Sequence, residues 1–263
     1  MAYIKEYWTD KEKRAEQARK HTKEMQEKYE LDIALSVMRT TMYKTNFQCV
    51  KNIEDKDTEI IIEDLDTVSA GSKYFVDDGS TMALLNFSSY KNPGGMFING
   101  SKAQEECLCH ESFLYNVLKE FVIEFYDWNN QHKNKALYLN RGLYSPSIMF
   151  LKNKKVFSCD VITCAAPNKS AAQKYQNVSD EENTEALRSR IKFVLDMAKD
   201  NCVDTLILGA YGCGVFGQDP TEVASIFKEY LETTHKCFDK VVFAIPKGRD
   251  GNLDAFRKVF ETN

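Results

Sequence analysis

The sequence predicts an α/β fold in which helices cover both faces of one central sheet, a three-layer α/β/α sandwich. Short apolar runs of strand length alternate along the chain with longer amphipathic segments of helical periodicity. The apolar runs are continuous, as in parallel strands whose two faces are both buried. No internal repeat or low-complexity linker divides the 263 residues, so we expect a single domain.

The N-terminal part of the chain is predicted to be helical. Residues 9–30 are rich in Lys, Glu, Gln and Ala and contain neither Gly nor Pro, a composition typical of a helix. Their apolar stripe is narrow, which indicates a helix packed on the surface of a larger body. We expect residues 1 to about 45 to form a helical extension of the domain that spans residues 1–263.

The middle of the chain alternates between predicted strand, loop and helix. The apolar run 81–87 predicts a buried strand, and a loop with Pro93 and two glycines follows it. From residue 103 to about residue 128, apolar side chains recur at helical spacing, which predicts one long helix.

The C-terminal half continues this alternation. The predicted elements are buried strands over 160–166, 203–210 and 240–245 and helices over 181–200, 219–231 and 253–260. Residues 167–182 are polar and rich in turn-forming residues, so we expect a long surface loop there.

The charge balance disfavours some classes of function. The formal net charge is −4 and the pI is about 5.7, so we expect neither a broad basic surface nor sequence-specific nucleic-acid binding. The charged N-terminus lacks the apolar core of a signal peptide, and no stretch approaches the ~18 apolar residues of a membrane span. We expect a monomeric cytoplasmic protein without membrane contact; a nuclear location stays open if the source is eukaryotic.

The eight cysteines are scattered and form no Cys-x-x-Cys pair, which predicts reduced thiols. Cys107, Cys109 and His110 could suggest a zinc site. However, they lie in a predicted helix and lack a second ligand pair at the usual spacing. We therefore predict neither a structural metal nor a cofactor.

Polar residues and glycines follow the predicted strand over 81–87. Asn86 lies at its end, and Asn92, Gly94 and Gly95 lie in the loop beyond it. Ligands of open α/β sheets bind outside the carboxyl ends of strands, and glycines let the backbone approach a ligand closely. Taken alone, this segment is equally compatible with an ordinary loop.

Gln104, Glu105 and Glu106 lie at the start of the helix predicted from residue 103. The helix dipole favours carboxylates in a first turn, and this alone would explain two glutamates. Adjacent residues point about 100° apart around a helix. If the pair is functional, we expect one glutamate to face a cleft and the other to brace the structure. An acid that protonates a leaving oxygen needs partial burial, because burial raises its pKa.

A third segment, residues 209–217, contains four glycines between a predicted strand and a predicted helix. Glycines permit unusual backbone angles and expose successive N–H groups, which suits a phosphate or diphosphate near a helix N-terminus. The segment matches neither a Walker A loop nor the GxGxxG pattern of dinucleotide-binding folds. Tyr211 and Phe216 add aromatic surfaces that could stack on a sugar or a base.

In order and spacing, these three segments resemble the microbial-type poly(ADP-ribose) glycohydrolases, a branch of the macrodomain fold. The family pattern is a strand ending in Asn-Phe, then Asn-Pro-Gly-Gly-Gly, then Gln-Glu-Glu on a helix, and later Gly-x-x-Gly-Cys-Gly-Val-Phe. The chain carries these motifs at Asn86-Phe87, at 92–95, at 104–106 and at 209–216, with ten residues between Gly94 and Glu105. Three motifs in register are far more specific than any one of them.

The resemblance implies a hydrolase that cleaves the ribose–ribose O-glycosidic bonds of poly(ADP-ribose) and releases ADP-ribose. It implies that Glu106 is the catalytic acid and that Glu105 positions the site. The substrate-binding residues that it implies are Asn86, Asn92, Gly94, Gly95, Gln104, Gly212, Cys213, Gly214, Val215 and Phe216. One departure is Met96, which replaces the third glycine of the family's run. Its side chain should narrow the site, so we expect cleavage from the chain end.

Two other functions stay open. One is an enzyme of the same fold that removes a single ADP-ribose from a protein, a nucleic acid or a small ester. The other is a non-catalytic reader of ADP-ribose. The presence of both Glu105 and Glu106 disfavours the reader, because binding requires only the loops. In each case the partner is ADP-ribose or an ADP-ribosylated macromolecule.

Overall fold

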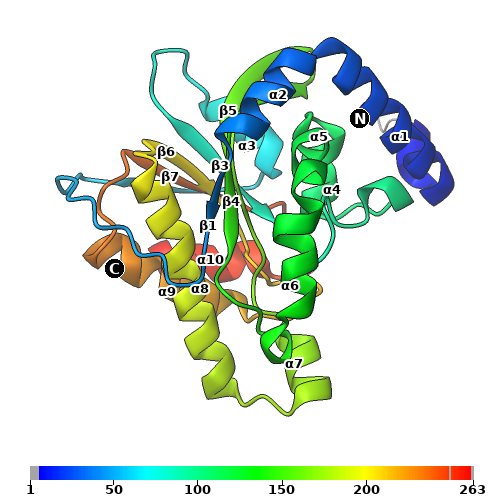
Figure 1. Cartoon of the computed structure of the whole chain (residues 1–263). Helices are drawn as coiled ribbons and strands as arrows, with labels where there is room; N and C mark the ends of the chain where they lie inside the picture. Colours follow the sequence, from blue (N-terminus) through cyan, green and yellow to red (C-terminus); the bar gives the residue numbers. More distant parts are fainter. Residues whose placement is uncertain (1–5, 249, 262–263) are drawn as a thin grey trace.

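A seven-stranded sheet forms the centre of the computed structural model, which describes residues 6–248 and 250–261 (Figure 1). The strands lie in the order β1-β4-β5-β3-β6-β7-β2. Their bounds are β1 Thr41–Tyr43, β2 Glu59–Glu63, β3 Met82–Phe87, β4 Gly142–Lys152, β5 Lys155–Cys164, β6 Thr205–Leu208 and β7 Lys240–Ala244. The run from β5 to β2 is parallel, whereas β4 is antiparallel to both β1 and β5. The predicted α/β class is confirmed, with a mixed sheet.

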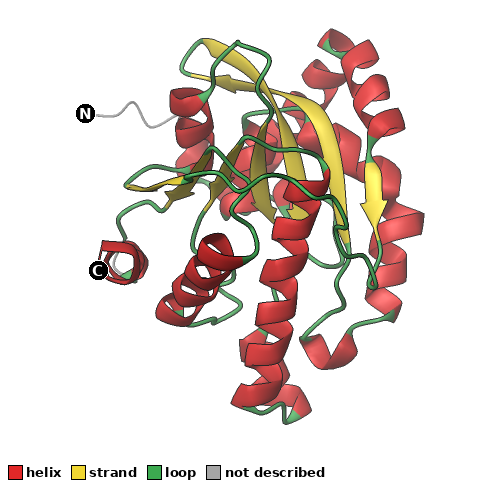
Figure 2. Cartoon of the chain, turned by 90° about the vertical axis from the view of Figure 1, so that its left-hand side faces the viewer, coloured by secondary structure: helices red, strands yellow, loops and turns green. Residues whose placement is uncertain are grey.

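Helices cover both faces of this sheet, as predicted (Figures 1 and 2). One face packs against α8 (Asp180–Asp200), α9 (Pro220–Thr233) and α10 (Asn252–Glu261). The opposite face packs against five helices: α1 (Lys11–Lys28), α2 (Glu30–Arg39), α3 (Thr67–Tyr74), α4 (Gln104–His110) and α5 (Leu114–Leu118). The predicted helices over 9–30, 181–200, 219–231 and 253–260 are therefore confirmed with small shifts at their ends.

The central strands contribute to both hydrophobic layers, which explains their unbroken apolar sequence. In β3, Ala83 and Leu85 pack toward α8 and α9, whereas Leu84 packs toward the opposite helices. Successive side chains of a strand point to opposite faces, so a strand covered on both sides needs an apolar residue at every position. Full burial of one such leucine stabilises the fold by about 1.5–3 kcal/mol.

The single long helix expected from residue 103 to 128 is wrong in detail. The segment is divided into α4 (Gln104–His110), α5 (Leu114–Leu118), a 3₁₀ turn η3 (Lys119–Phe121), a π-helical turn η4 (Val122–Asp127) and α6 (Trp128–Gln131). The first break follows from contact with β4. The Leu151 N–H donates to the Glu111 carbonyl at 2.7 Å, and Ser112 pairs with Phe150 across an isolated bridge. These bonds to a strand end α4 after His110.

The long surface loop expected over 167–182 is also wrong. Helix α7 spans Lys169–Gln176, and α8 already begins at Asp180. The polar residues that suggested a loop are helix caps. Asn168 accepts from the Ala171 N–H at 3.0 Å, and Ser179 and Glu182 form a reciprocal capping box at the start of α8. Side-chain capping favours Asn and Ser at helix starts as strongly as in turns.

The N-terminal helices pack against the α4–α5 side of the sheet. Asp10 caps α1 by accepting from the Lys13 N–H at 2.8 Å, and Ala18 and Met25 supply its buried apolar contacts. Three short 3₁₀ turns complete the helical elements: η1 Glu6–Thr9, η2 Phe97–Asn99 and η5 Asn134–Ala136. Over residues 6–248 and 250–261, no helix has both the length and the apolar character needed to cross a membrane.

Candidate active site

A cleft of about 410 Å³ opens at the carboxyl ends of the parallel strands. Its wall includes Phe87 at the end of β3, Ala210 after β6 and Ala244 at the end of β7. Ala103 and Gln104, at the start of α4, form another part of the wall. This is the edge at which open α/β sheets bind their ligands.

The glycine-rich segment after β6 forms one side of the cleft, through Gly212, Gly214, Val215 and Phe216. The N–H groups of Gly214, Val215 and Phe216 have no acceptor among the parts of the chain that the structure describes. Three successive unpaired N–H groups before the start of α9 form a concave donor surface, which suits an anion.

The backbone angles that the segment needs lie before and after these donors. Gly212 has a φ of 77°, and a Cβ there would lie 2.9 Å from the Ala166 Cβ. At Gly214 no atom lies within 4 Å of the position that a Cβ would take. The glycine at 212 is therefore required by conformation and packing, whereas the glycine at 214 leaves open space.

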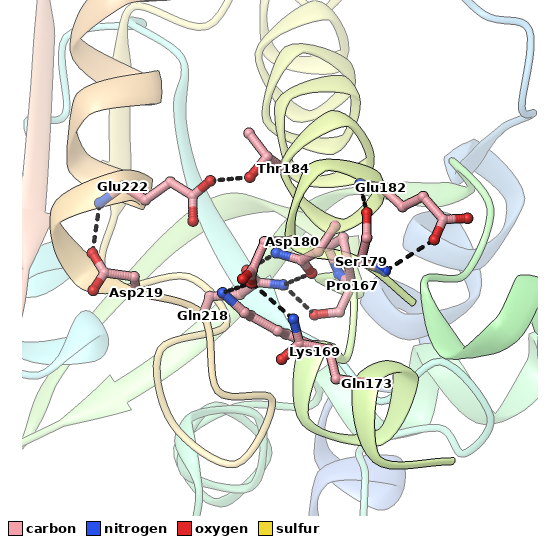
Figure 3. Close-up of polar contacts among 11 residues, drawn as sticks. Pro167, Lys169, Gln173, Ser179, Asp180, Glu182, Thr184, Gln218, Asp219 and Glu222 are labelled. Carbon is pink, nitrogen blue, oxygen red and sulfur yellow. Dashed lines mark hydrogen bonds and ion pairs between the residues drawn. The ribbon is translucent and has the colours of Figure 1, made fainter. Parts of the chain in front are cut away.

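The far end of the glycine-rich segment is fixed by a network of amides (Figure 3). Gln218 donates to the Pro167 carbonyl at 2.8 Å. It also exchanges two hydrogen bonds of 2.9 Å with Asn183 of α8. Asp219 then caps α9 by accepting from the Glu222 N–H at 2.9 Å. The segment is thus held between α8 and α9, which limits its freedom to collapse into the cleft.

The two aromatics of the segment have different positions. Tyr211 is fully buried, and its hydroxyl donates to the Cys164 carbonyl at 2.9 Å. The suggestion that Tyr211 could stack on a ligand is therefore wrong; its ring belongs to the core. Phe216 lines the cleft, and Val215 is 88% exposed beside it. Cys213 is not among the cleft-lining residues and packs against the α8–α9 core.

Glu105 is almost entirely buried at the first turn of α4. One of its carboxylate oxygens accepts from the Ser89 N–H at 2.6 Å. The other accepts from the Asn86 side-chain amide at 3.2 Å. Asn86 is itself fully buried and also donates to the Thr163 hydroxyl at 3.3 Å. Glu105 therefore ties α4 to the end of β3, and Asn86 supports it from the sheet.

Glu106 is 5% exposed and joins α4 to the preceding turn. Its Oε1 accepts from the Met96 N–H at 2.9 Å, and its Oε2 accepts from the Ala103 N–H at 2.8 Å. We expected one glutamate to face the cleft and one to brace the structure. Both instead brace it, and neither is among the cleft-lining residues. They follow directly on Ala103 and Gln104, which do line the cleft.

Gly95 lies against both carboxylates. It has a φ of 61°, and a Cβ would lie 2.7 Å from the Glu106 Oε1 and 3.0 Å from the Glu105 Oε2. Only glycine adopts this conformation without strain and leaves room for the two side chains. The backbone at Gly95 therefore closely approaches the two glutamates.

Burial raises the pKa of Glu105 to about 8, although the bonds from Ser89 and Asn86 oppose this shift. The unfolded-state pKa is about 4.5, so the folded protein holds this proton more tightly. The stability that this proton contributes is complete below about pH 4.5 and is lost as pH rises toward about 8.

We therefore expect the free energy of unfolding to fall by about 1.4 kcal/mol per pH unit within that window because of Glu105. Urea denaturation at pH 5, 6, 7 and 8 measures the slope, and Glu105→Gln, which cannot titrate, should flatten it. Equal slopes in the wild type and in Glu105→Gln would show that Glu105 titrates normally.

Of the other predicted substrate-binding residues Gln104, Asn92 and Gly94, only Gln104 lines the cleft. The Gln104 side chain lines the cleft, but its amide also accepts from the Phe87 N–H and donates to the Leu85 carbonyl, both at 2.8 Å. Asn92 is exposed, and its carbonyl accepts from the Gly95 N–H at 3.1 Å. Gly94 is buried against Tyr115. Gln104 and Asn92 thus shape the backbone around the glutamates.

Met96 occupies the turn next to Glu106 without backbone strain. Its φ is −112°, which any L-residue adopts. The side chain is 45% exposed. A methionine can therefore replace the family's third glycine with no change of the backbone.

Several cleft residues had no signal in the sequence. Asp66 and Thr67 line the cleft at the start of α3, and Asp250 and Asn252 line it near the start of α10. Asp66 has a helix-cap pattern, since it accepts from the Ser69 N–H at 2.9 Å. That pattern marks a helix start and does not distinguish a binding residue.

The cysteines of the Cys107–His110 segment lie in different surroundings. Cys109 is buried in the core, and Cys107 is half-buried at the cleft. Within residues 6–248 and 250–261, no three or more His, Cys, Asp or Glu side chains are grouped so that they could hold a metal ion.

Comparison with known proteins agrees with the motifs. Residues 10–153 match the catalytic domain of microbial-type PARG. A crystal structure of poly(ADP-ribose) glycohydrolase from Thermomonospora curvata superposes with a TM-score of 0.85 at 28% identity, covering 95% of this chain and 100% of that one. The glycohydrolase from Deinococcus radiodurans in complex with ADP-ribose gives 0.78 at 30% identity, covering 88% and 97%. A search of curated protein sequences found no significant match. The chain belongs to the microbial-type poly(ADP-ribose) glycohydrolases, a family of glycosidases with a macrodomain-like fold.

Proposed function

We propose that this protein hydrolyses the ribose–ribose O-glycosidic bonds of poly(ADP-ribose), acts from the chain end and releases ADP-ribose. One observation carries the proposal. On one side of the cleft, the N–H groups of Gly214, Val215 and Phe216 have no acceptor among the described residues. On another side, the cleft-lining residues Ala103 and Gln104 are followed directly in the chain by the buried Glu105 and Glu106. An anion site beside a candidate acid fits a substrate whose sugar carries a diphosphate.

The donor surface at Gly214, Val215 and Phe216 would bind the diphosphate, and Phe216 would stack on a sugar or base within the same cleft. The D. radiodurans relative has been crystallised with ADP-ribose. This supports the same class of ligand for the present cleft.

Glu106 would act as the general acid. Its carboxyl proton passes to the bridging oxygen as the bond between that oxygen and the anomeric carbon breaks, leaving an oxocarbenium-like ribose. Water then attacks the anomeric carbon and returns a proton to Glu106, so the carboxyl group is regenerated. The Met96 and Ala103 N–H groups fix the carboxylate on both oxygens.

Glu105 is assigned a positioning role. Its two oxygens are occupied by Ser89 and Asn86, and it is more deeply buried than Glu106. Adjacent glutamates on one helix do not present the two opposed carboxylates of ordinary glycosidases. A single working carboxylate, with the bound diphosphate held near by, is therefore the mechanism that we propose.

The test is turnover on two substrates, purified poly(ADP-ribose) and a mono-ADP-ribosylated protein, with released ADP-ribose as the readout. The proposal predicts release from the polymer at a higher kcat/KM than from the protein. Release only from the protein would assign a mono-ADP-ribosyl hydrolase, and binding without release from either would assign a reader.

The proposal that cleavage occurs from the chain end rests on the position of Met96. Its side chain lies at the turn that binds Glu106 and is partly open to solvent, where it would restrict a polymer that continues past the cleaved ribose. We expect Met96→Gly to release longer oligomers early in the reaction and to raise polymer turnover a few-fold. The added backbone freedom costs about 0.5–1 kcal/mol of stability.

Product lengths from a time course test this expectation, with Met96→Leu as the control because leucine keeps the bulk of the side chain. Early release of long oligomers by the wild type would show that Met96 does not close the site.

A further inference from the structure

Helix α1 packs against the turn that holds Glu106, here called the catalytic turn (residues 94–101). Arg14 is one of three buried residues of α1. Its Nε donates to the Gly100 carbonyl at 2.7 Å, and its Nη1 donates to the Trp8 carbonyl at 2.7 Å. Arg14 is 8% exposed, and its guanidinium group donates to two backbone carbonyls, one of which belongs to the catalytic turn.

The contact between helix and turn is close. Gly100 has a φ of 78°, and a Cβ there would overlap the Lys11 carbonyl oxygen of α1. Any other residue at 100 would push the turn away from the helix. A second, longer bond runs from Arg19 to the Ile98 carbonyl at 3.3 Å.

A continuous set of hydrogen bonds runs from Arg14 to Glu106. Arg14 donates to the Gly100 carbonyl, and the Gly100 N–H donates to the Phe97 carbonyl at 3.0 Å. The next N–H, of Ser101, donates to the Met96 carbonyl at 3.1 Å. The Met96 N–H then donates to the Glu106 carboxylate at 2.9 Å. The Glu106 carboxylate is therefore oriented by a turn that α1 fixes from outside.

We propose that Arg14 is a positioning residue for catalysis, which makes helix α1 part of the functional site. It touches no cleft-lining residue in the contacts above and acts on Glu106 through the catalytic turn. The inference rests on the proposed role of Glu106 as the acid. It assigns to Arg14 an effect on the chemical step and none on binding of the diphosphate, whose proposed site is at Gly214, Val215 and Phe216.

Arg14→Met tests the proposal. We expect kcat on poly(ADP-ribose) to fall by about 10-fold to 100-fold, because small displacements of a catalytic group have effects of this size. The Kd for ADP-ribose, measured by calorimetry, should stay within about two-fold. Lys20→Met is the matched control, since Lys20 lies on the same helix with a side chain that is 67% exposed. It should leave kcat unchanged. A kcat of Arg14→Met equal to that of the control, or a loss confined to Kd, overturns the proposal.

A double-mutant cycle separates positioning from general loss of structure. If Arg14 acts through Glu106, Arg14→Met should cause no further loss in a Glu106→Gln background under single-turnover conditions. An equal loss in both backgrounds would mean that Arg14 acts elsewhere. If Arg14→Met does not fold, Gly100→Ala displaces the turn while Arg14 is kept. A folded Gly100→Ala protein with wild-type kcat then overturns the proposal. Wild-type turnover in Glu106→Gln would instead refute the role of Glu106 as the acid, and no turnover of poly(ADP-ribose) by the wild type would refute the proposed function, so each result is distinguishable.

Discussion

Replacing Glu106 with glutamine is expected to lower turnover on poly(ADP-ribose) by at least about 100-fold, the usual scale for loss of a general acid. Glutamine keeps the size of the side chain, and its carbonyl oxygen can still accept from the Met96 or the Ala103 N–H. The fold should therefore survive, whereas the proton for the leaving oxygen is gone. ADP-ribose release under saturating polymer measures the effect.

The affinity for ADP-ribose should be kept in the same variant, because the proposed diphosphate site lies at Gly214–Phe216. Glu120→Gln is a suitable control, since this glutamate lies in η3 with a side chain that is 53% exposed. Its turnover should equal that of the wild type. Near-normal turnover of Glu106→Gln would remove Glu106 from the mechanism.

Replacing Gly214 with valine is expected to weaken ADP-ribose binding by about 10-fold to 100-fold. No protein atom lies within 4 Å of a Cβ at this position, and Gly214 lines the cleft. The valine side chain would therefore enter open space beside the donor N–H groups and exclude a phosphate oxygen without disturbing the core. The loss of one hydrogen bond to a charged group, about 1.5–3 kcal/mol, corresponds to this range of affinity.

Calorimetry with ADP-ribose measures the change, and the melting temperature should shift little. Val215→Thr is the matched control, because it keeps the backbone N–H and the branched shape at an exposed neighbouring position. Its affinity should stay within about two-fold of the wild type. Unchanged affinity in Gly214→Val would mean that this segment only connects β6 to α9.

The glycine-rich pattern of this segment predicts unusual backbone angles. Gly212 has such an angle, but no positive φ occurs at Gly214. The expected effect at 214 is therefore steric, and a conformational effect belongs to 212.

The parts of the fold that could be predicted are those whose two faces are both buried. Strands β3, β5, β6 and β7 have continuous apolar sequences because helices cover them on each side. The edge strand β2 has glutamates at both ends and is only half-buried, so its apolar run is short. Strand β4 contains Pro146 and a register shift between Ser145 and Ile148, which interrupt its pattern. The sequence did not predict β2 and β4, because the apolar pattern of each strand depends on its position in the sheet.

The candidate site could likewise be predicted only in part. The order of motifs predicted that Gly95, Glu105, Glu106 and the glycine-rich segment would be brought together, and the structure places them around one edge of the sheet. The burial of Tyr211 could not be predicted, because its hydroxyl is bound by Cys164, 47 positions away. The role of Arg14 was equally hidden, since its partner Gly100 lies 86 positions along the chain. Contacts of this range depend on the finished fold and leave no local pattern.

The most direct test of the account is a crystal structure of Glu106→Gln bound to a two-unit fragment of poly(ADP-ribose). We expect one diphosphate to accept hydrogen bonds from the N–H groups of Gly214, Val215 and Phe216. We also expect the side chain at 106 to lie about 2.6–3.2 Å from the bridging glycosidic oxygen. A fragment bound with its glycosidic oxygen beyond the reach of residue 106, or with its diphosphate away from these N–H groups, would contradict the account.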